Sequence, residues 1–255
     1  MADTLLEVRG ISKIFDGLTA LDGVSFDVRT GEIRAVIGPN GAGKTTLFNI
    51  ICRVFSATSG DVTFNGKVIS RAPAHNIAKF GIARTFQNLQ IFGTMTVFEN
   101  VMVGCHVNGH TEMFNAALRA PSARREEHAL QDRATAILER IGLTERSQEL
   151  AAGLPVGQQR LLELGRALAM QPKLILLDEP AAGLTTRETT ALSNLVRRIR
   201  DEDGITIVLI EHDMSMVMGI SDRVVVLDHG QAIADATPSE IQKDERVIAA
   251  YLGVD

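Results

Sequence analysis

A glycine-rich stretch, GPNGAGKTT, spans residues 38–46. Its first glycine is the last residue of the apolar run IRAVIG. It matches the pattern G-x-x-x-x-G-K-[ST], in which glycines allow backbone N–H groups to turn toward a phosphate. A helix that begins at such a loop adds partial positive charge at its N-terminus. The sequence therefore predicts a phosphate-binding loop made of Gly38, Pro39, Asn40, Gly41, Ala42, Gly43, Lys44, Thr45 and Thr46.

Two residues of this loop have specific expected tasks. Lys44 would reach the β- and γ-phosphates of a nucleotide, and the Thr45 hydroxyl would hold Mg²⁺. GTPases, kinases and ATPases all use such loops, but a GTPase should also carry the base-reading motif N-K-x-D. That motif is missing from this sequence, so we expect ATP and Mg²⁺ as the cofactors.

Acidic residues and a histidine follow two other apolar runs. LILLDEP ends in Asp178, Glu179 and a proline, and ITIVLIEHD contains His212. Asp178 fits the acid on the magnesium side, acting through metal-bound water, and Glu179 fits a general base for the attacking water. His212 would lie at the carboxyl end of a sheet, where ligands bind, and could contact the γ-phosphate or that water. Alone, each would be read as a structural polar residue, but beside a phosphate loop they predict a catalytic site.

The hydrophobic pattern indicates the elements that must position these residues. Alternating and then apolar residues at 5–15 and 24–38 predict strands, and a helix should run from Thr45 to Phe55. Asn65-Gly66 predicts a tight hairpin turn within residues 60–70. Residues 82–87, IARTFQ, predict a short extended segment.

The second half of the chain alternates between helical and strand patterns. The charged, alanine-rich part of residues 88–150 predicts a pair of solvent-facing helices. The other elements are expected as a helix at 157–170, a buried strand at 173–180, an amphipathic helix at 185–204, a buried strand at 205–213, two strands within 223–236 and a helix over 237–253 that begins at a capping box. Apolar strands that alternate with helices predict a parallel sheet covered on both faces.

Composition limits the classes of function. With 45% hydrophobic and 22% charged residues and a net charge of −5, the chain is typical of a globular protein and lacks the basic excess of nucleic-acid binders. We therefore expect no nucleic-acid partner. Cys52 and Cys105 have no metal-like spacing, which favours free thiols in a reducing compartment. The sequence has no apolar run long enough for a membrane span, and MADTLLEVRG lacks the pattern of a secretory signal.

Taken together, the motifs resemble those of ATP-binding-cassette (ABC) ATPases. GPNGAGKTT, RTFQ, GQQRLLELGRALAMQPKLILLDEPAAGL and IEHD stand in that family's order, and the resemblance covers essentially the whole chain. The sequence is most similar to importer ATPase subunits for branched-chain amino acids. The stretches that carry this similarity are ARTFQNLQIFGTMTVFENVMVG, LLDEPAAGL, IEHDMSMVMGISDRV and VIAAYLG. Cassettes for urea uptake or lipopolysaccharide export share parts of them.

The resemblance implies an α/β fold of the P-loop NTPase (RecA-like) type, with a mostly parallel sheet core. It implies one nucleotide-binding domain over residues 1–255. Residues 1–87 and 166–255 would form the catalytic lobe with an antiparallel β subdomain. Residues from about 88 to 165 would form an inserted α-helical subdomain that carries the signature motif and docks a transmembrane partner.

The resemblance also implies roles for single residues. Gln87 of RTFQ would meet Mg²⁺ and the reacting water, and Phe15 would stack on adenine unless it is a core residue of the first hairpin. Residues 181–185 would form a loop that crosses a dimer interface. Leu154, Gly157 and Gln158 would contact the nucleotide of a partner subunit as the signature motif.

The resemblance implies an assembly as well. Cassette ATPases work as head-to-tail dimers, so the expected partner is a second, related ABC ATPase subunit. Two transmembrane permease subunits and, indirectly, a periplasmic binding protein would complete an importer at the cytoplasmic face of the plasma membrane. The alternatives are an exporter subunit, an ABC ATPase outside transport, such as a DNA-repair or translation cassette, and a nucleotide-binding regulatory module without turnover.

Two positions depart from the family's pattern. The usual signature Leu-Ser-Gly-Gly-Gln reads LPVGQ here, so Pro155 replaces the serine whose hydroxyl would touch the partner's γ-phosphate. Proline also lacks an N–H donor, although it is well tolerated in the first turn of a helix. Thr185 stands where an aspartate is usual. We therefore expect the half-site completed by Pro155 to be weaker than the one that contains Glu179.

Overall fold

The computed structural model describes residues 3–107 and 121–252 of the chain. The chain divides into two compact units, Met1–Gln87 with Lys173–Asp255 and, separately, Asn88–Pro172. The boundary that we expected at residue 165 falls inside helix α5 (Val156–Ala169), and this continuous helix stays whole within the second unit. Residues 108–120 of the expected helical segment and Gly253 of the C-terminal stretch lie outside the described residues.

The first unit contains a six-stranded sheet in the order β10-β9-β3-β8-β7-β6. Its strands are β3 (Ile33–Ile37), β6 (Ile82–Arg84), β7 (Leu174–Asp178), β8 (Thr206–Ile210), β9 (Arg223–Asp228) and β10 (Gln231–Ala236). All neighbours are parallel except β10, which pairs antiparallel with β9 at the edge. Every residue of β3, β7 and β8 is buried, which explains why all but one residue of each strand is apolar and confirms the predicted central strands.

A second, antiparallel sheet of the same unit has the order β2-β1-β4-β5. Its strands are β1 (Thr4–Phe15), β2 (Leu18–Arg29), β4 (Ser59–Phe64) and β5 (Lys67–Val68). Asn65 and Gly66 both have positive φ, 48° and 73°, as a tight hairpin turn between β4 and β5 requires. The predicted antiparallel subdomain and its hairpin are therefore confirmed.

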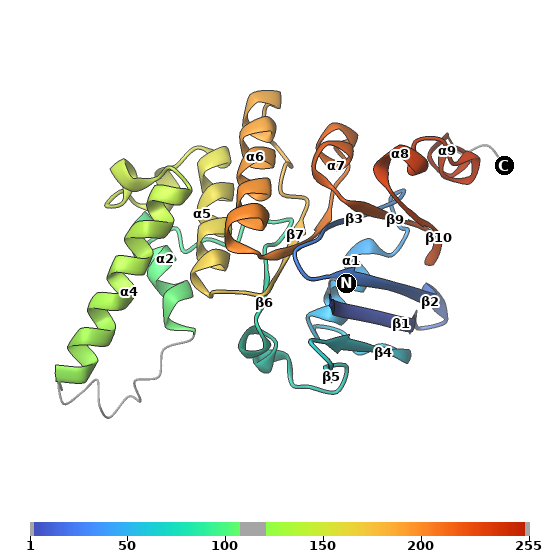
Figure 1. The fold of residues 1–255 in the computed structure, drawn as a ribbon, viewed down its shortest axis with the longest axis horizontal. Coiled ribbons are helices and arrows are strands. Elements are labelled where there is room, and N and C mark those ends of the chain that lie inside the picture. The colour runs from blue at the N-terminus through green and yellow to red at the C-terminus, as the bar shows by residue number, and fades with distance from the viewer. Residues whose placement is uncertain (1–2, 108–120, 253–255) are drawn as a thin grey trace. The chain divides into compact units, whose positions relative to one another are not determined.

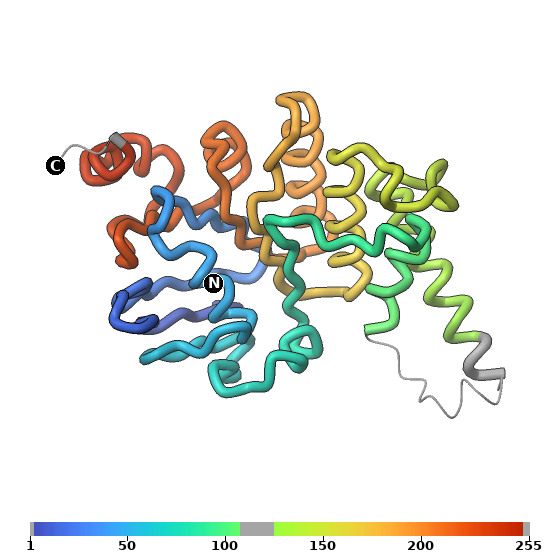
Figure 2. Tube along the Cα trace, turned by 180° about the vertical axis from the view of Figure 1, so that it is seen from behind, coloured from blue at the N-terminus to red at the C-terminus, as the bar shows by residue number. Residues whose placement is uncertain are grey.

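Helices cover both faces of the six-stranded sheet (Figure 1). Helix α1 (Lys44–Ile51) packs between the two sheets, where Leu47 and Phe48 join the main hydrophobic core. It ends before the predicted Phe55, because Arg53 takes a positive φ of 61° that no α-helix can continue. Helices α6 (Thr186–Asp203) and α7 (Met214–Ile220) lie together on the opposite face, as Figures 1 and 2 both show.

The C-terminal segment forms two helices where one was expected. Helix α8 (Pro238–Ile241) starts at the predicted capping box of Thr237 and Glu240, and helix α9 (Glu245–Leu252) follows it. The Asp244 carboxylate accepts a hydrogen bond from the Arg246 N–H at 2.9 Å. Such a side-chain cap starts a new helix, so the chain turns between the two.

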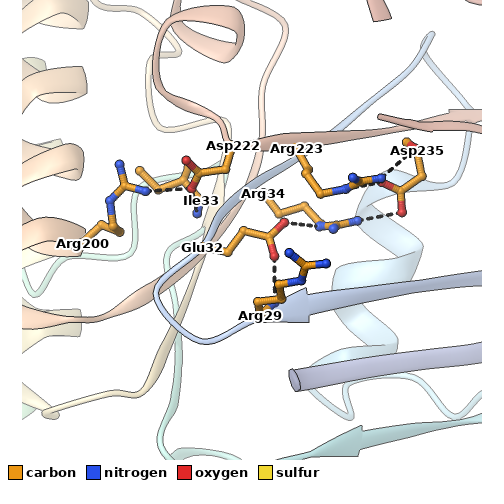
Figure 3. A network of polar contacts seen from close by, with 8 residues as sticks. All are labelled: Arg29, Glu32, Ile33, Arg34, Arg200, Asp222, Arg223 and Asp235. Atoms are coloured by element: carbon orange, nitrogen blue, oxygen red, sulfur yellow. Dashed lines mark hydrogen bonds and ion pairs between the residues drawn. The ribbon is translucent and has the colours of Figure 1, made fainter. Parts of the chain in front are cut away.

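A polar network ties strands together at the amino-terminal edge of the six-stranded sheet (Figure 3). The buried Arg34 guanidinium contacts Glu32 at 2.9 Å and Asp235 of β10 at 2.8 Å. Arg223 also contacts Asp235, and the Asp222 carboxylate accepts from the Ile33 N–H and from Arg200. The network connects β3, β9 and β10 at the end of the sheet where its parallel strands begin. Their carboxyl ends lie at the opposite end.

The second unit is helical. It comprises α2 (Val97–His106), α4 (Pro121–Arg140), the single turns Thr144–Arg146 and Ala151–Gly153, and α5. Two further single turns, Ala74–Asn76 and Ala78–Phe80, belong to the first unit. A Cβ on Gly104 would lie 2.3 Å from the carbonyl oxygen of Arg166, so glycine allows α2 and α5 to pack closely. Within its described part, the segment confirms the predicted helices. Among the helices that the structure describes, none is long and apolar enough to cross a membrane.

Candidate nucleotide site

The glycine-rich loop between β3 and α1 has a backbone that only glycine tolerates. Gly38 and Gly43 have positive φ of 149° and 98°. A Cβ on Gly38 would lie 2.0 Å from the Leu227 carbonyl oxygen, and one on Gly43 would lie 2.6 Å from that of Ala20. Side chains are excluded at both places, and the loop curves tightly at the start of the helix, the arrangement expected of an anion-binding nest.

Lys44 points into the curve of this loop. Its Nζ donates hydrogen bonds to the carbonyl oxygens of Gly38 and Pro39, both at 2.8 Å, and the residue is only 6% exposed. Burial lowers the pKa of Lys44, and the carboxylates of Glu179 and Asp178 act in the opposite direction. Thr45 follows at the exposed start of α1. The loop thus holds an ammonium group where a polyphosphate would be bound.

The order of the parallel strands brings the predicted catalytic residues to one edge. β8 lies between β3 and β7. The carboxyl ends of parallel strands meet at the same edge of a sheet, where ligands bind in folds of this class. The glycine-rich loop follows β3, Asp178 ends β7 and His212 follows β8. The structure therefore brings together the loop, the acidic pair and the histidine.

Asp178 has one occupied and one free carboxylate oxygen. Its Oδ2 accepts from Arg84 Nη2 at 2.7 Å, while Oδ1 is buried without a hydrogen-bond partner among the described residues. Nη1 of the same guanidinium donates to Asn49 Oδ1 at 2.7 Å. Arg84 therefore holds Asp178 from one side and leaves Oδ1 for another ligand. A buried oxygen without a partner is costly unless something binds it.

Glu179 turns away from its neighbour because its backbone is left-handed. Its φ is 49°, and its N–H donates to the Ile210 carbonyl oxygen at 2.9 Å. Gln87 Nε2 donates to Glu179 Oε2 at 2.8 Å, and His212 Nε2 lies 3.2 Å from Oε1. The predicted trio of Gln87, Glu179 and His212 thus lies within hydrogen-bond distance. A strained backbone of this kind is typical of functional sites.

The sequence analysis missed two residues of this site. Arg84 stands within the stretch ARTFQ, and Glu211 within IEHD, but neither was assigned a task. Both are buried: the Arg84 side chain is 7% exposed and Glu211 is 3% exposed. The feature of the sequence that points to Arg84 is the acid at the end of a buried strand. A buried carboxylate needs a cation, and Asp178 therefore predicts a positively charged partner.

Phe15 lies at the end of β1, outside the fully buried core. Its ring meets the Phe55 ring edge-on, with centroids 5.4 Å apart, and Lys13 Nζ lies 4.6 Å from the ring centroid. Phe15 is half-buried, and its partner Phe55 packs against the main hydrophobic core. Stacking on adenine remains a prediction.

The signature stretch begins helix α5 of the second unit. Leu154 is buried at 4% exposure, so its side chain anchors the helix and only its backbone could meet a ligand. Pro155 is the N-cap residue rather than a first-turn residue, and its carbonyl oxygen accepts from the N–H groups of Gln158 and Gln159. The N–H groups at the start of a helix have no acceptor within it, so those of Val156 and Gly157 point out of its N-terminus.

Thr185 has a structural task at the start of α6. Its side chain accepts from the Glu188 N–H, and the Glu188 carboxylate accepts from the Thr185 N–H, which completes a capping box. Threonine is a good N-cap, as aspartate is. The departure from the family's aspartate therefore preserves the helix start.

Comparison with known proteins agrees with this geometry. The family model described as ABC transporter matches residues 21–182, and that described as branched-chain amino acid ATP-binding cassette transporter matches residues 233–255. The chain is 44% identical to the high-affinity branched-chain amino acid transport ATP-binding protein LivG of Salmonella typhimurium, over 99% of each chain. It is 42% identical to the protein BraF of Pseudomonas aeruginosa, which has the same description, again over 99% of each.

A solved structure is also similar. It is an ATP-binding cassette of an ABC transporter in its ADP conformation, with a TM-score of 0.86 and 34% identity. The match covers 99% of this chain and 100% of the chain in the solved structure. The loop, the acidic pair and the histidine lie together on a fold shared over the full length. The chain therefore belongs to the ABC transporter family and is one of its ATP-binding cassettes.

Proposed function

We propose that this ATP-binding cassette hydrolyses ATP to energise the uptake of branched-chain or related amino acids through membrane permease partners. The observation that carries the hydrolytic part is the placement of Lys44, Asp178 and Glu179 at one edge of the sheet, with Gln87 and His212 within hydrogen-bond distance of Glu179. The substrate class is supported by the relatives named for branched-chain amino acid transport, which match the chain over its whole length.

The side chains divide the chemistry among them. The loop N–H groups and Lys44 would bind the phosphates and stabilise charge that develops during transfer. The carboxylate of Glu179 would accept a proton from the attacking water, and Gln87 would orient that water. His212 lies 3.2 Å from Glu179 and would contact the γ-phosphate or the same water. Positioning and electrostatic stabilisation account for most of the catalysis in this class of reaction.

The site also fits Mg²⁺. Magnesium prefers oxygen ligands and is usually held by one or two side chains together with substrate phosphates. Asp178 Oδ1 is buried without a hydrogen-bond partner in the described part of the chain, and Thr45 supplies a hydroxyl at the start of α1. Thr45 and Gln87 would bind the ion directly, and Asp178 would act through its bound water. When bound, the ion would neutralise charge on the phosphates.

The complete site would need a second, related ABC ATPase subunit. A cassette described as dimeric in a post-hydrolysis state, bound to ADP and Pi, has a similar fold, with a TM-score of 0.77 at 24% identity. In a head-to-tail dimer the N-terminus of α5, with Gly157 and Gln158, would face the nucleotide of the partner. This assembly is supported by the N–H groups of Val156 and Gly157, which lack acceptors within the helix.

The membrane partners would dock on the second unit. Phe92, Met95 and Leu150 form what we term the apolar patch, and they are 45%, 37% and 56% exposed. The Ala151 N–H donates to the Met95 carbonyl oxygen, which brings the two ends of this patch together. Apolar side chains gathered at the surface mark interaction sites. Two permease subunits would place the cassette at the cytoplasmic face of the plasma membrane, and a periplasmic binding protein would act indirectly.

The test measures hydrolysis and transport in the assembled complex. The Glu179→Gln variant should still bind ATP but lose hydrolysis at the half-site that contains residue 179, since the amide cannot take the proton. Cells that carry the variant should lose uptake of labelled leucine. If turnover stays at the wild-type rate in this variant, Glu179 is not the base. If hydrolysis is lost but the uptake of labelled leucine does not depend on the wild-type chain, the ATPase assignment stands. The transported solute is then not leucine.

A further inference from the structure

Glu211 is a buried carboxylate with three backbone partners on two loops. It is 3% exposed. Oε1 accepts from the N–H of Ala181 at 2.6 Å, and Oε2 accepts from the N–H groups of His212 at 2.8 Å and Asp213 at 3.2 Å. All three donors are backbone groups, so a replacement at 181, 212 or 213 by any residue other than proline keeps these donors.

These partners lie on either side of the contact between the proposed base and the histidine. Ala181 is two residues after Glu179, with Pro180 between them, and His212 is the residue after Glu211 itself. One carboxylate therefore fixes the loop that follows Glu179 and the loop that carries His212. His212 Nε2 lies 3.2 Å from Glu179 Oε1. Two loops held by one side chain cannot move apart without breaking a hydrogen bond.

A carboxylate suits this position better than any neutral group. It offers acceptors on both oxygens and no hydrogen, so both loops can donate to it at once. A glutamine at 211 would keep the size but turn one oxygen into an NH₂ group, which would face an N–H donor. Hydrogen bonds to charged groups are among the stronger ones, and the loss of an acceptor for a buried donor is costly.

We propose that Glu211 is a positioning residue for ATP hydrolysis. It fixes the spacing between Glu179 and His212 through the backbone of the loops that carry them. This inference rests on the proposed function of those two residues. The hydrogen bonds of Glu211 in the described structure go to Ala181, His212 and Asp213 and not to the phosphate loop, so we expect nucleotide binding not to depend on it. It acts on the rate of the chemical step and not on the affinity for ATP.

The first experiment compares the full chain, in its assembled complex, with the Glu211→Gln and Glu211→Asp variants. Glu211→Gln should lower kcat on the order of tenfold or more, as the loss of one charge-assisted hydrogen bond implies, with the KM for ATP unchanged. Glu211→Asp keeps both acceptors and should recover part of the rate. The control is Glu240→Gln, which changes a carboxylate that also accepts a backbone N–H, in a capping box of α8.

A merely structural role would give a different result. It would lower the melting temperature and the amount of active protein, and would change ATP binding and kcat together. The inference is overturned if the KM for ATP rises while kcat stays constant, or if the loss of rate follows the loss of folded protein measured by thermal unfolding.

The second experiment is a double-mutant cycle with His212→Ala, read from single-turnover hydrolysis so that slow rates are measurable. If Glu211 acts through His212, Glu211→Gln should cause little further loss once the imidazole is gone. An equal loss in both backgrounds contradicts the inference. The Glu179→Gln variant run in parallel separates the two proposals. Its turnover at the wild-type rate would refute the catalytic assignment, while normal turnover of Glu211→Gln alone would refute only this inference.

Discussion

At the scale of single residues, Arg84 holds Asp178, the acid that we propose acts on the Mg²⁺ side of the site. One guanidinium nitrogen contacts Asp178 and another contacts Asn49, each at 2.7 Å, so the group bridges two partners. Lysine has one charged nitrogen in place of the planar guanidinium fork, so it cannot contact Asp178 and Asn49 with the same geometry. We predict that Arg84→Lys raises the Mg²⁺ concentration needed for half-maximal ATPase activity, by about tenfold or more, as changes behind metal ligands do.

The control for Arg84 is Arg53→Lys, because Arg53 lies in the same unit and donates to the Ala72 carbonyl oxygen. A titration of ATPase activity with MgCl₂ gives the half-maximal concentration for each variant. Equal requirements for Mg²⁺ in the two variants would show that Arg84 does not orient Asp178.

Cys52 should be unreactive in the folded protein. Burial raises the pKa of this thiol to about 11, against the lowering effect of Arg84. Only the thiolate reacts, so at pH 8 roughly one molecule in a thousand is competent. In a Cys105→Ser chain, alkylation by iodoacetamide should be slow at pH 8 and should accelerate as pH approaches 11 or when urea unfolds the chain. Alkylation of the folded chain at the rate of a free thiol would contradict this prediction.

At the scale of elements, the buried network around Arg34 holds β3 to β10. The side chains of Arg34 and Glu32 are 4% and 7% exposed, and their contact is 2.9 Å. Removal of the guanidinium leaves the buried carboxylate without its cation, which typically costs about 3–5 kcal/mol. We predict that Arg34→Ala lowers the free energy of unfolding by that amount, measured by urea denaturation.

The matched control for Arg34 is Arg9→Ala, because Arg9 is half-exposed and contacts Asp27 and Glu7. Exposed ion pairs contribute about 0–1 kcal/mol, so this variant should stay close to the wild-type stability. A similar loss in both variants would mean that the buried network is no stronger than a surface pair.

Local patterns predicted most elements, and tertiary contacts decided the rest. The strand at 174–178 and the capping box at Thr237 follow from apolar runs and cap residues alone, and both are confirmed. The early end of α1 at Ile51 depends on the left-handed Arg53, which no hydrophobic period reveals. Glu211 became visible only when the fold brought the Ala181 N–H to its carboxylate, 30 residues away in sequence.

At the scale of the whole molecule, the apolar patch of Phe92, Met95 and Leu150 is the proposed contact with the membrane subunits. A charge placed on it would have to lose its water on docking. We predict that Leu150→Glu lowers co-purification with the permeases by roughly tenfold or more, as a central interface residue would, while ATP binding persists. Val68→Glu is the control, because Val68 is 57% exposed and lies in the other unit. Equal co-purification of both variants would place the contact elsewhere.

The two ATP sites of the proposed dimer should be unequal. This chain would supply Glu179 to one half-site and the signature with Pro155 to the other. Pro155 is an N-cap without a side-chain cap hydrogen bond. A serine hydroxyl there would add a hydrogen bond to a charged phosphate, worth roughly 1.5–3 kcal/mol. In a complex that carries Glu179→Gln, only the half-site completed by Pro155 remains. The added change Pro155→Ser should raise its residual ATPase rate by about tenfold or more.

Val156→Ser is the matched control for Pro155→Ser. It adds the same hydroxyl one residue later, at an exposed first-turn position of α5. Phosphate release by the assembled complex, measured for each combination with Glu179→Gln, distinguishes the two positions. If Pro155→Ser and Val156→Ser raise the rate equally, the hydroxyl at 155 has no special access to the phosphate. If neither variant raises the residual ATPase rate, the missing hydroxyl does not limit that half-site. The N–H groups at the helix start would then hold the γ-phosphate by themselves, and the rate would depend on the partner's own acid.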